Sequence, residues 1–148
     1  MKDVTTIGWD VSSNYIGVAV MTNGVLVGLW GIELAKCKTH FEKYDLMRDS
    51  ARSLMSQLSE SARSSCVHYV EDRLGNFTKG LTTLQTLMVL AQFNAVMSWC
   101  LDSLSPGRVK HMLPVTTKRV VGYKKVVGED VKVTKSRLAS ELCPSFVV

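Results

Sequence analysis

The chain opens with three short apolar runs separated by turn-forming residues. The runs cover residues 5–11, 15–21 and 25–30, and their β-branched and aromatic residues are typical of strands. The pair Asn23-Gly24 between the second and third runs predicts a type I′ hairpin turn, because both central positions of that turn need positive φ. The N-terminal stretch therefore predicts three antiparallel strands.

Residues 39–60 change to a helical period. Apolar side chains recur there every three or four positions, and charged residues fill the other positions. This pattern predicts an amphipathic helix that covers one side of the sheet, and the small polar stretch 59–65 is expected to be a linker. The predicted apolar face consists of Phe41, Tyr44, Met47, Ala51, Leu54, Met55 and Leu58.

A fourth strand and a long helix are predicted next. The apolar run 66–71 reads as the strand, and Thr78 or Thr82 is expected to cap the helix, which Ser105-Pro106-Gly107 ends. Glutamine, asparagine and serine side chains interrupt this apolar segment, which favours a buried helix of a soluble protein over a membrane span. The predicted buried stripe is Leu84, Leu87, Met88, Ala91, Ala95, Trp99 and Leu104.

The last part of the chain predicts a strand over 109–115, a basic stretch over 116–125 and a helix over 134–142. Strands separated by helices imply parallel neighbours, because parallel strands need crossover connections. The expected fold class is therefore α/β and matches the RNase H-like architecture, a mixed sheet of three antiparallel strands and then two parallel strands, with helices on both faces. We expect a single domain over residues 1–148.

Composition narrows the class of protein. The 148 residues are 46% hydrophobic and 21% charged, as in soluble globular domains, and the formal charge of +5 favours an anionic partner such as nucleic acid. The sequence shows no signal peptide, so we expect an intracellular protein with reduced thiols. The four cysteines form no CxxC pair, which argues against a zinc site. They are Cys37, Cys66, Cys100 and Cys143.

Two carboxylates stand out because each belongs to an apolar strand. Asp10 has apolar neighbours, where a charge is unfavourable unless a metal ion or another partner compensates it, and Glu71 ends the fourth predicted strand. Side chains alternate along a strand, so at most one of Glu71 and Asp72 shares a site with Asp10. Simpler interpretations stay open, in which Asp10 caps the turn that follows it and Glu71 pairs with Arg73.

Other conspicuous residues are interpreted as structural. The histidines have no ligand spacing and the tryptophans are expected in the core. They are His40, His68, His111, Trp9, Trp30 and Trp99.

Several motifs together resemble the RuvC-type Holliday junction resolvases. Ile7-Gly8-Trp9-Asp10-Val11-Ser12-Ser13, followed by Tyr15-Ile16-Gly17-Val18-Ala19-Val20, resembles the first motif of that family, and Val67-His68-Tyr69-Val70-Glu71 resembles the second. Lys118-Arg119-Val120-Val121-Gly122 and Val133-Thr134-Lys135-Ser136 resemble its basic segment. The resemblance covers nearly the whole chain, and it depends on the order and spacing of the motifs.

This resemblance implies a metal-dependent, structure-selective endonuclease that cuts Holliday junctions and related branched DNA by two-metal phosphodiester hydrolysis. Asp10 and Glu71 are the implied catalytic residues and ligands of Mg²⁺ or Mn²⁺. A homodimer is implied as well, because symmetric cutting of a two-fold junction needs two sites. The implied DNA-binding residues are Ser12, Arg73, Asn76, Phe77, Lys79, Lys118, Arg119, Lys124, Lys125 and Lys135.

The C-terminus departs from the family pattern. The final helix of the family supplies one or two further carboxylates, and residues 145–148 end this chain where that helix is expected to begin. We therefore expect either a chain truncated at its C-terminus or a variant that has lost part of its metal site.

The sequence leaves three alternatives open. The first is a catalytically impaired protein of the same fold that binds branched DNA, and the second is an RNA-processing nuclease of the same superfold. The third is an actin-like or sugar-kinase-like ATPase fragment. It is disfavoured because the chain has no second nucleotide-binding half.

Overall fold

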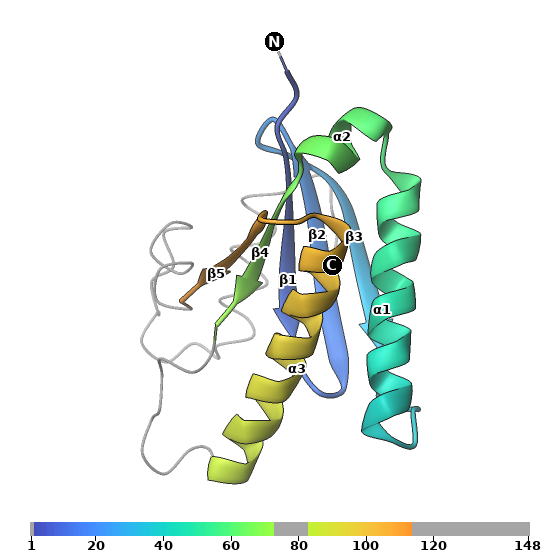
Figure 1. Cartoon of the computed structure of the whole chain (residues 1–148), viewed down its shortest axis with the longest axis vertical. Coiled ribbons are helices and arrows are strands. Elements are labelled where there is room, and N and C mark those ends of the chain that lie inside the picture. Colours follow the sequence, from blue (N-terminus) through green and yellow to red (C-terminus); the bar gives the residue numbers. More distant parts are fainter. Residues whose placement is uncertain (1, 73–82, 114–148) are drawn as a thin grey trace, which may run out of the picture. The chain divides into compact units, whose positions relative to one another are not determined.

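The computed structural model describes residues 2–72 and 83–113. The chain separates into two compact units, Met1–Leu113 and Pro114–Val148, and the described residues all belong to the first. The predicted single domain over 1–148 stays a prediction. The described elements, in chain order, are β1 (Thr5–Val11), β2 (Tyr15–Thr22), β3 (Val25–Glu33), α1 (His40–Gln57), α2 (Glu60–Ser65), β4 (Val67–Glu71), α3 (Leu84–Leu104) and β5 (Val109–Met112) (Figure 1).

The strands form one mixed sheet in the order β3-β2-β1-β4-β5. β1 pairs with β2 and β2 with β3 in antiparallel fashion, whereas β1–β4 and β4–β5 are parallel pairs. This arrangement confirms the predicted combination of three antiparallel and two parallel strands. α1 and α3 pack on the same face of the sheet and contact each other (Figure 1). The predicted helix over 134–142 lies outside the described residues.

The turn between β2 and β3 has the predicted geometry. Asn23 and Gly24 have φ values of 53° and 80°, as a type I′ turn requires. The Asn23 side chain also binds the start of the chain, because its Oδ1 accepts from the Val4 amide at 2.9 Å and its Nδ2 donates to Asp3 Oδ1 at 2.8 Å. The turn therefore fixes the N-terminal segment as well as the hairpin.

The helix α1 starts with a cap similar to a capping box, except that the Glu42 carboxylate accepts from the residue before the N-cap. Thr39 Oγ1 accepts from the Glu42 amide at 3.1 Å, and Glu42 Oε2 accepts from the Lys38 amide at 2.7 Å. The predicted apolar face is buried at Met47 and further along the helix, but Phe41 is exposed. The expected linker 59–65 was wrong, because α2 forms there as a short helix capped by Ser59.

The helix α3 differs from its prediction in two respects. Its cap is Thr83, whose Oγ1 accepts from the Thr86 amide at 3.2 Å, and neither Thr78 nor Thr82. The predicted stripe was also wrong, because Leu84, Met88, Ala95 and Trp99 are exposed. The side that packs on the sheet consists of Phe93, Asn94, Met97, Cys100 and Leu101. Both sides of the helix are apolar, so hydrophobicity did not indicate which one faces the sheet.

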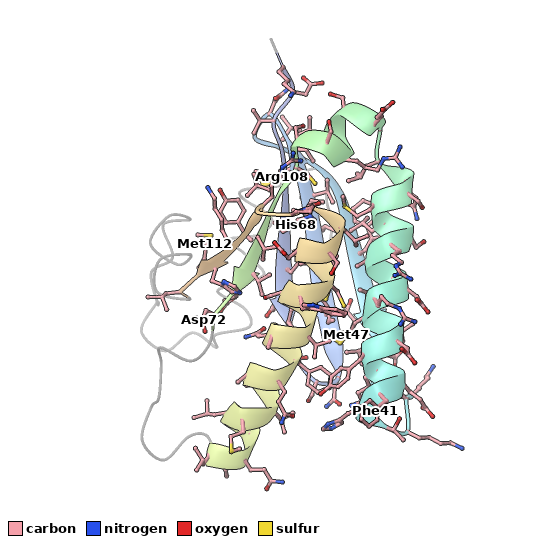
Figure 2. The ribbon with its side chains drawn as sticks, viewed as in Figure 1. Phe41, Met47, His68, Asp72, Arg108 and Met112 are labelled. Carbon is pink, nitrogen blue, oxygen red and sulfur yellow. The ribbon has the colours of Figure 1, made fainter. Side chains whose placement is uncertain are left out.

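His68 is fully buried and serves a structural role, as predicted. Its Nδ1 accepts from Trp9 Nε1 at 3.1 Å, and its Nε2 lies 3.0 Å from Ser105 Oγ. Burial, with a smaller contribution from the positive charge of nearby Arg108, lowers the pKa of His68 to about 4 (Figure 2). The imidazole is therefore neutral at pH 7 and joins β1, β4 and the end of α3.

The three tryptophans differ in burial. Trp9 lies in the core as predicted, whereas Trp30 and Trp99 are exposed, so their assignment to the core was wrong. The cysteines in the described part of the chain, Cys37, Cys66 and Cys100, are free thiols, as expected.

Within residues 2–72 and 83–113, α3 is the one helix that is long and apolar enough to cross a membrane on length and composition alone. One side of this helix packs against the sheet.

Candidate active site

The β1–β4 pairing brings the two predicted acids to neighbouring strands. The two strands run parallel with Trp9 opposite Val70, and Asp10 and Glu71 are the next residues along each strand. Neighbouring strands lie about 4.8 Å apart. The structure therefore places the Asp10 and Glu71 backbones side by side although 60 residues separate them in the sequence.

Both acids lie on the sheet face opposite α1 and α3. Trp9 and Val70 are buried against the helices, so alternation directs the following side chains to the other face. Glu71 is half-buried there and Asp10 is exposed. The expectation of a buried Asp10 carboxylate was therefore wrong, because its apolar neighbours Trp9 and Val11 point to the helix side.

Asp72 follows Glu71 and lies just beyond the end of β4. Its amide donates to the Met112 carbonyl at 2.7 Å, and Figure 2 shows it at the end of β4. Of the two adjacent acids, Glu71 is the one whose position in the sheet matches Asp10.

Two glycines lie beside Asp10 on the next two strands of the sheet. Asp10 pairs with Gly17, and Gly17 pairs with Gly31 on the edge strand β3. A Cβ atom at Gly31 would collide with the Tyr15 hydroxyl, so the Tyr15 ring lies over this glycine. The row from Glu71 to Gly31 thus has two carboxylates at one end and a half-exposed aromatic ring at the other.

A basic residue occupies the same face on the other side of the acids. Lys110 pairs with Tyr69 across the β4–β5 ladder, and its Nζ lies 6.0 Å from the centre of the Tyr69 ring. Tyr69 and Glu71 are two residues apart on β4 and share a face. Lys110 therefore places a positive charge on the sheet face that carries the carboxylates. Lys110 was not among the predicted site residues, although it is a charged residue within the predicted strand 109–115.

Asn94 supports the site from the helix side. Its Nδ2 donates to the Glu71 carbonyl at 3.3 Å, and its Oδ1 is buried without a hydrogen-bond partner. A buried amide oxygen without a partner is unfavourable, so an apolar residue would pack more easily at this position of α3. The observed bond ties the end of β4 to the middle of the helix.

Ser12, a predicted DNA-binding residue, is engaged in the β1–β2 turn. Its Oγ donates to the Tyr15 carbonyl at 2.6 Å and accepts from the Tyr15 amide at 3.1 Å. Lys43 of α1 stabilises the same turn, because its Nζ donates to the Ser13 carbonyl at 2.7 Å. The turn is therefore held rigidly next to the strand that carries Asp10.

The donor set suits a hard divalent cation only in part. Carboxylate oxygens are the ligands that Mg²⁺ prefers, and Asp10 and Glu71 supply them from adjacent strands. No group of three or more histidine, cysteine, aspartate or glutamate residues gathers within the described part of the chain. Two carboxylates with water can hold one ion, whereas a two-metal cluster needs further ligands.

The remaining predicted site residues lie outside the described residues. They are Arg73, Asn76, Phe77, Lys79, Lys118, Arg119, Lys124, Lys125 and Lys135.

The strand order and the parallel β1–β4 pair define an α/β fold of the RNase H-like class. Known structures agree with this assignment. Thermus thermophilus RuvC in complex with a Holliday junction substrate superposes with a TM-score of 0.67 and 9% sequence identity, covering 95% of this chain and 79% of that one. The T. thermophilus RuvC structure gives a TM-score of 0.63, also at 9% identity and with the same coverage.

At the level of sequence, no protein-family model matches the chain. No curated protein matches it either. The similarity is therefore one of fold.

Proposed function

We propose that this protein is a metal-dependent, structure-selective endonuclease that acts on branched DNA such as Holliday junctions. The observation that carries the proposal is the placement of Asp10 and Glu71 next to each other on adjacent parallel strands. The fold similarity to RuvC, which has been solved with a Holliday junction substrate, supports the choice of substrate class. Like that class of enzyme, the protein would act inside the cell.

Asp10 and Glu71 would hold Mg²⁺ or Mn²⁺. A divalent ion bound there would activate water and stabilise the charge that develops on the scissile phosphate. Lys110 would bind a neighbouring phosphate, and the Tyr15 ring would offer a surface for stacking on a base. The predicted DNA contacts of Ser12 and of the residues outside the described ranges belong to the same proposal.

A second candidate is a protein of the same fold that binds branched DNA without cutting it. It is favoured by one observation, the presence of only two clustered carboxylates in the described residues. Under this alternative, junction binding would persist in EDTA and Asp10 could be replaced without effect on any activity.

Cleavage of a labelled four-way junction in Mg²⁺ or Mn²⁺ distinguishes the two candidates. We expect Asp10→Asn and Glu71→Gln to lower the cleavage rate at least about a hundredfold, because each removes a negative ligand from the site. Binding of the junction in EDTA should change little. Asp45→Asn, which alters an exposed acid on α1, is the matched control and should cut normally.

Two results would reject the nuclease. One is a junction that stays uncut in every divalent metal. If the protein still binds the junction tightly, this result supports the non-catalytic alternative. The other is an affinity for the junction that is no higher than the affinity for a duplex, which would also exclude branched DNA as the specific ligand.

The proposed nuclease acts as a homodimer. A four-way junction has two-fold symmetry, and a pair of sites related by the same symmetry can cut opposite strands at equivalent positions.

A further inference from the structure

The outer edge of β3 offers backbone groups for a further strand. β3 is the last strand of the sheet next to α1, and no strand of the described residues pairs with its other side (Figure 1). Edge strands usually carry charged residues, proline or bulges that prevent such pairing. β3 has no charged residue and no proline from Val25 to Ile32, and its bulge lies at Val27, where the register with β2 shifts. The edge from Gly28 to Glu33 is therefore regular and unprotected by these means.

A groove lies on the helix side of the sheet at this part of the edge. It has a volume of about 380 Å³ and is lined by β3 and by the second half of α1. Trp9, Val18 and Leu54 supply its apolar lining, and the hydroxyl groups of Ser50 and Ser53 lie along the α1 side. An apolar groove with a few polar groups on one wall is typical of a binding site.

Trp30 forms the β3 side of the groove. It pairs with the buried Val18 across the β2–β3 ladder and therefore lies on the helix side of the sheet. A Cβ atom at Gly28 would collide with the Trp30 ring, so the indole lies over this glycine. Trp30 is nevertheless 40% exposed. Its ring therefore offers an aromatic surface to a ligand in the groove.

The charge of the groove restricts the chemistry of its ligand. Of the described residues that line it, Asp49 alone is charged. Asp49 Oδ1 accepts from Arg48 Nε at 3.1 Å in an exposed pair, and a carboxylate can accept further hydrogen bonds. A negative ligand such as a phosphate is disfavoured there. A guanidinium group suits the groove, because it stacks on aromatic rings and binds carboxylates through two N–H groups.

We propose that β3 binds an extended segment of a partner protein, which pairs with the edge from Gly28 to Glu33 and places an arginine in the groove. In this mode of recognition, main-chain hydrogen bonds supply affinity and pockets for alternate side chains supply specificity. A strand added in the plane of the sheet directs every second side chain to the helix side, toward Trp30 and Asp49. The groove and the acidic pair lie on opposite faces of the sheet, so this site is separate from the proposed nuclease site.

A synthetic heptapeptide tests the site on the unaltered full chain. It has a central arginine, a valine two residues away on each side, threonine elsewhere and blocked ends. In heteronuclear NMR spectra we expect saturable shifts of the amide signals of residues 28–33 and of the Trp30 indole N–H. The dissociation constant should lie below about 1 mM.

Two altered peptides separate the contributions of the backbone and the arginine. A peptide with an N-methylated backbone cannot donate main-chain hydrogen bonds and should bind at least about tenfold more weakly. A peptide with glutamate in place of the arginine should lose affinity to a similar extent, because its charge would meet Asp49. Both comparisons leave the protein unaltered, so they do not depend on the folding of a variant.

Variants of the groove test the assigned side chains. Trp30→Ala and Asp49→Asn should each weaken binding of the arginine peptide at least about threefold, and Asp49→Asn should also reduce the preference for arginine over glutamate. Asp45→Asn is the matched control, because Asp45 also pairs with Arg48 but does not line the groove. It should bind like the unsubstituted chain. Circular dichroism checks that each variant is folded.

Four results would overturn the proposal. The first is the absence of shifts in residues 28–33 at millimolar peptide, and the second is equal binding of the N-methylated or glutamate peptide. The third is binding of N-acetylarginine amide as tightly as the peptide, which would indicate a small-molecule site. The fourth is a change of the β3 signals with protein concentration alone, which would mean that a second copy of the chain occupies this edge.

Discussion

Burial keeps His68 neutral, with a smaller contribution from the charge of Arg108, and two buried hydrogen bonds fix its tautomer. Nδ1 accepts from the Trp9 indole, so the proton of the neutral ring lies on Nε2, which faces Ser105. Protonation would place a second hydrogen at Nδ1 against the indole N–H. It would also bury a positive charge near Arg108.

This arrangement predicts a loss of stability in mild acid. The pKa of His68 is about 4 in the folded chain, whereas the ordinary value of 6.5 applies to the unfolded chain. The unfolded chain therefore binds more protons than the folded chain between pH 4 and pH 6.5. Stability therefore falls as the pH decreases from 6.5 toward 4. By linkage the unfolding free energy should drop by about 2 kcal/mol between pH 7.5 and pH 5. Urea unfolding at the two pH values measures the change.

Variants separate His68 from the other histidines. His68→Phe should be less stable at pH 7.5 but should show a much flatter response between pH 5 and 7.5. His111→Gln, which alters the exposed partner of Ser98, should keep the response of the unsubstituted chain. An equally steep response in His68→Phe would refute the assignment.

Single residues in the candidate site were predictable to different degrees. Asp10 and Glu71 could be selected as candidates because each is an acid within an apolar strand. Their position on the face opposite the helices depends on which side of β1 packs against α1 and α3. The sequence of the strand alone does not determine that side. Lys110, Tyr15 and Asn94 reach the site only through pairing and packing between elements distant in sequence.

At the scale of elements, the β2–β3 turn is the clearest local determinant. Gly24→Ala should lower stability by about 1 kcal/mol, because a Cβ at φ 80° is strained although it would meet no other atom within 4 Å. The midpoint of chemical unfolding measures this. Gly8→Ala is the control, since its Cβ also meets nothing within 4 Å and its φ is not positive. Equal losses in the two variants would show that the turn is not the cause.

The helix α3 makes a different prediction through Asn94. Asn94→Leu should reduce junction cleavage several-fold, because the Glu71 backbone loses its tie to the helix. Stability should change by less than about 1 kcal/mol, since removal of the buried amide oxygen without a partner offsets the lost bond.

Cleavage kinetics and thermal unfolding of the same preparations measure the two effects. Met97→Leu, a volume-conserving change on the same side of α3, should leave both unchanged. A large stability loss with normal cleavage in Asn94→Leu would mean that Asn94 has a purely structural role.

Elements were predicted best where the signal is local. The turn residues Asn23-Gly24 and the period of α1 identified a hairpin and a helix correctly. The short helix α2 has no apolar period to reveal it. α3 was recognised as a helix but assigned the wrong buried side, because Leu84 and Phe93 are equally apolar and only the sheet selects between them.

For the whole molecule, the order of strands and helices was sufficient to predict the mixed sheet. Crossover rules leave few ways to arrange three antiparallel strands followed by two parallel strands, and the chain follows one of them. The register between β1 and β4 could not be derived in this way. It depends on contacts such as the bond from Trp9 to His68, which join residues far apart in sequence.

The long separation between β1 and β4 has a consequence for folding kinetics. The β1–β2–β3 meander closes through short turns and can form early, whereas β4 must return across α1 and α2 before it pairs with β1. Asp10 and Glu71 meet only at this late, non-local step. The acidic pair therefore exists only in chains that have completed the parallel pairing, and a partly folded chain displays Asp10 without its neighbour. Since Trp9 becomes bonded to His68 in the same step, its fluorescence should follow the assembly of the site during refolding.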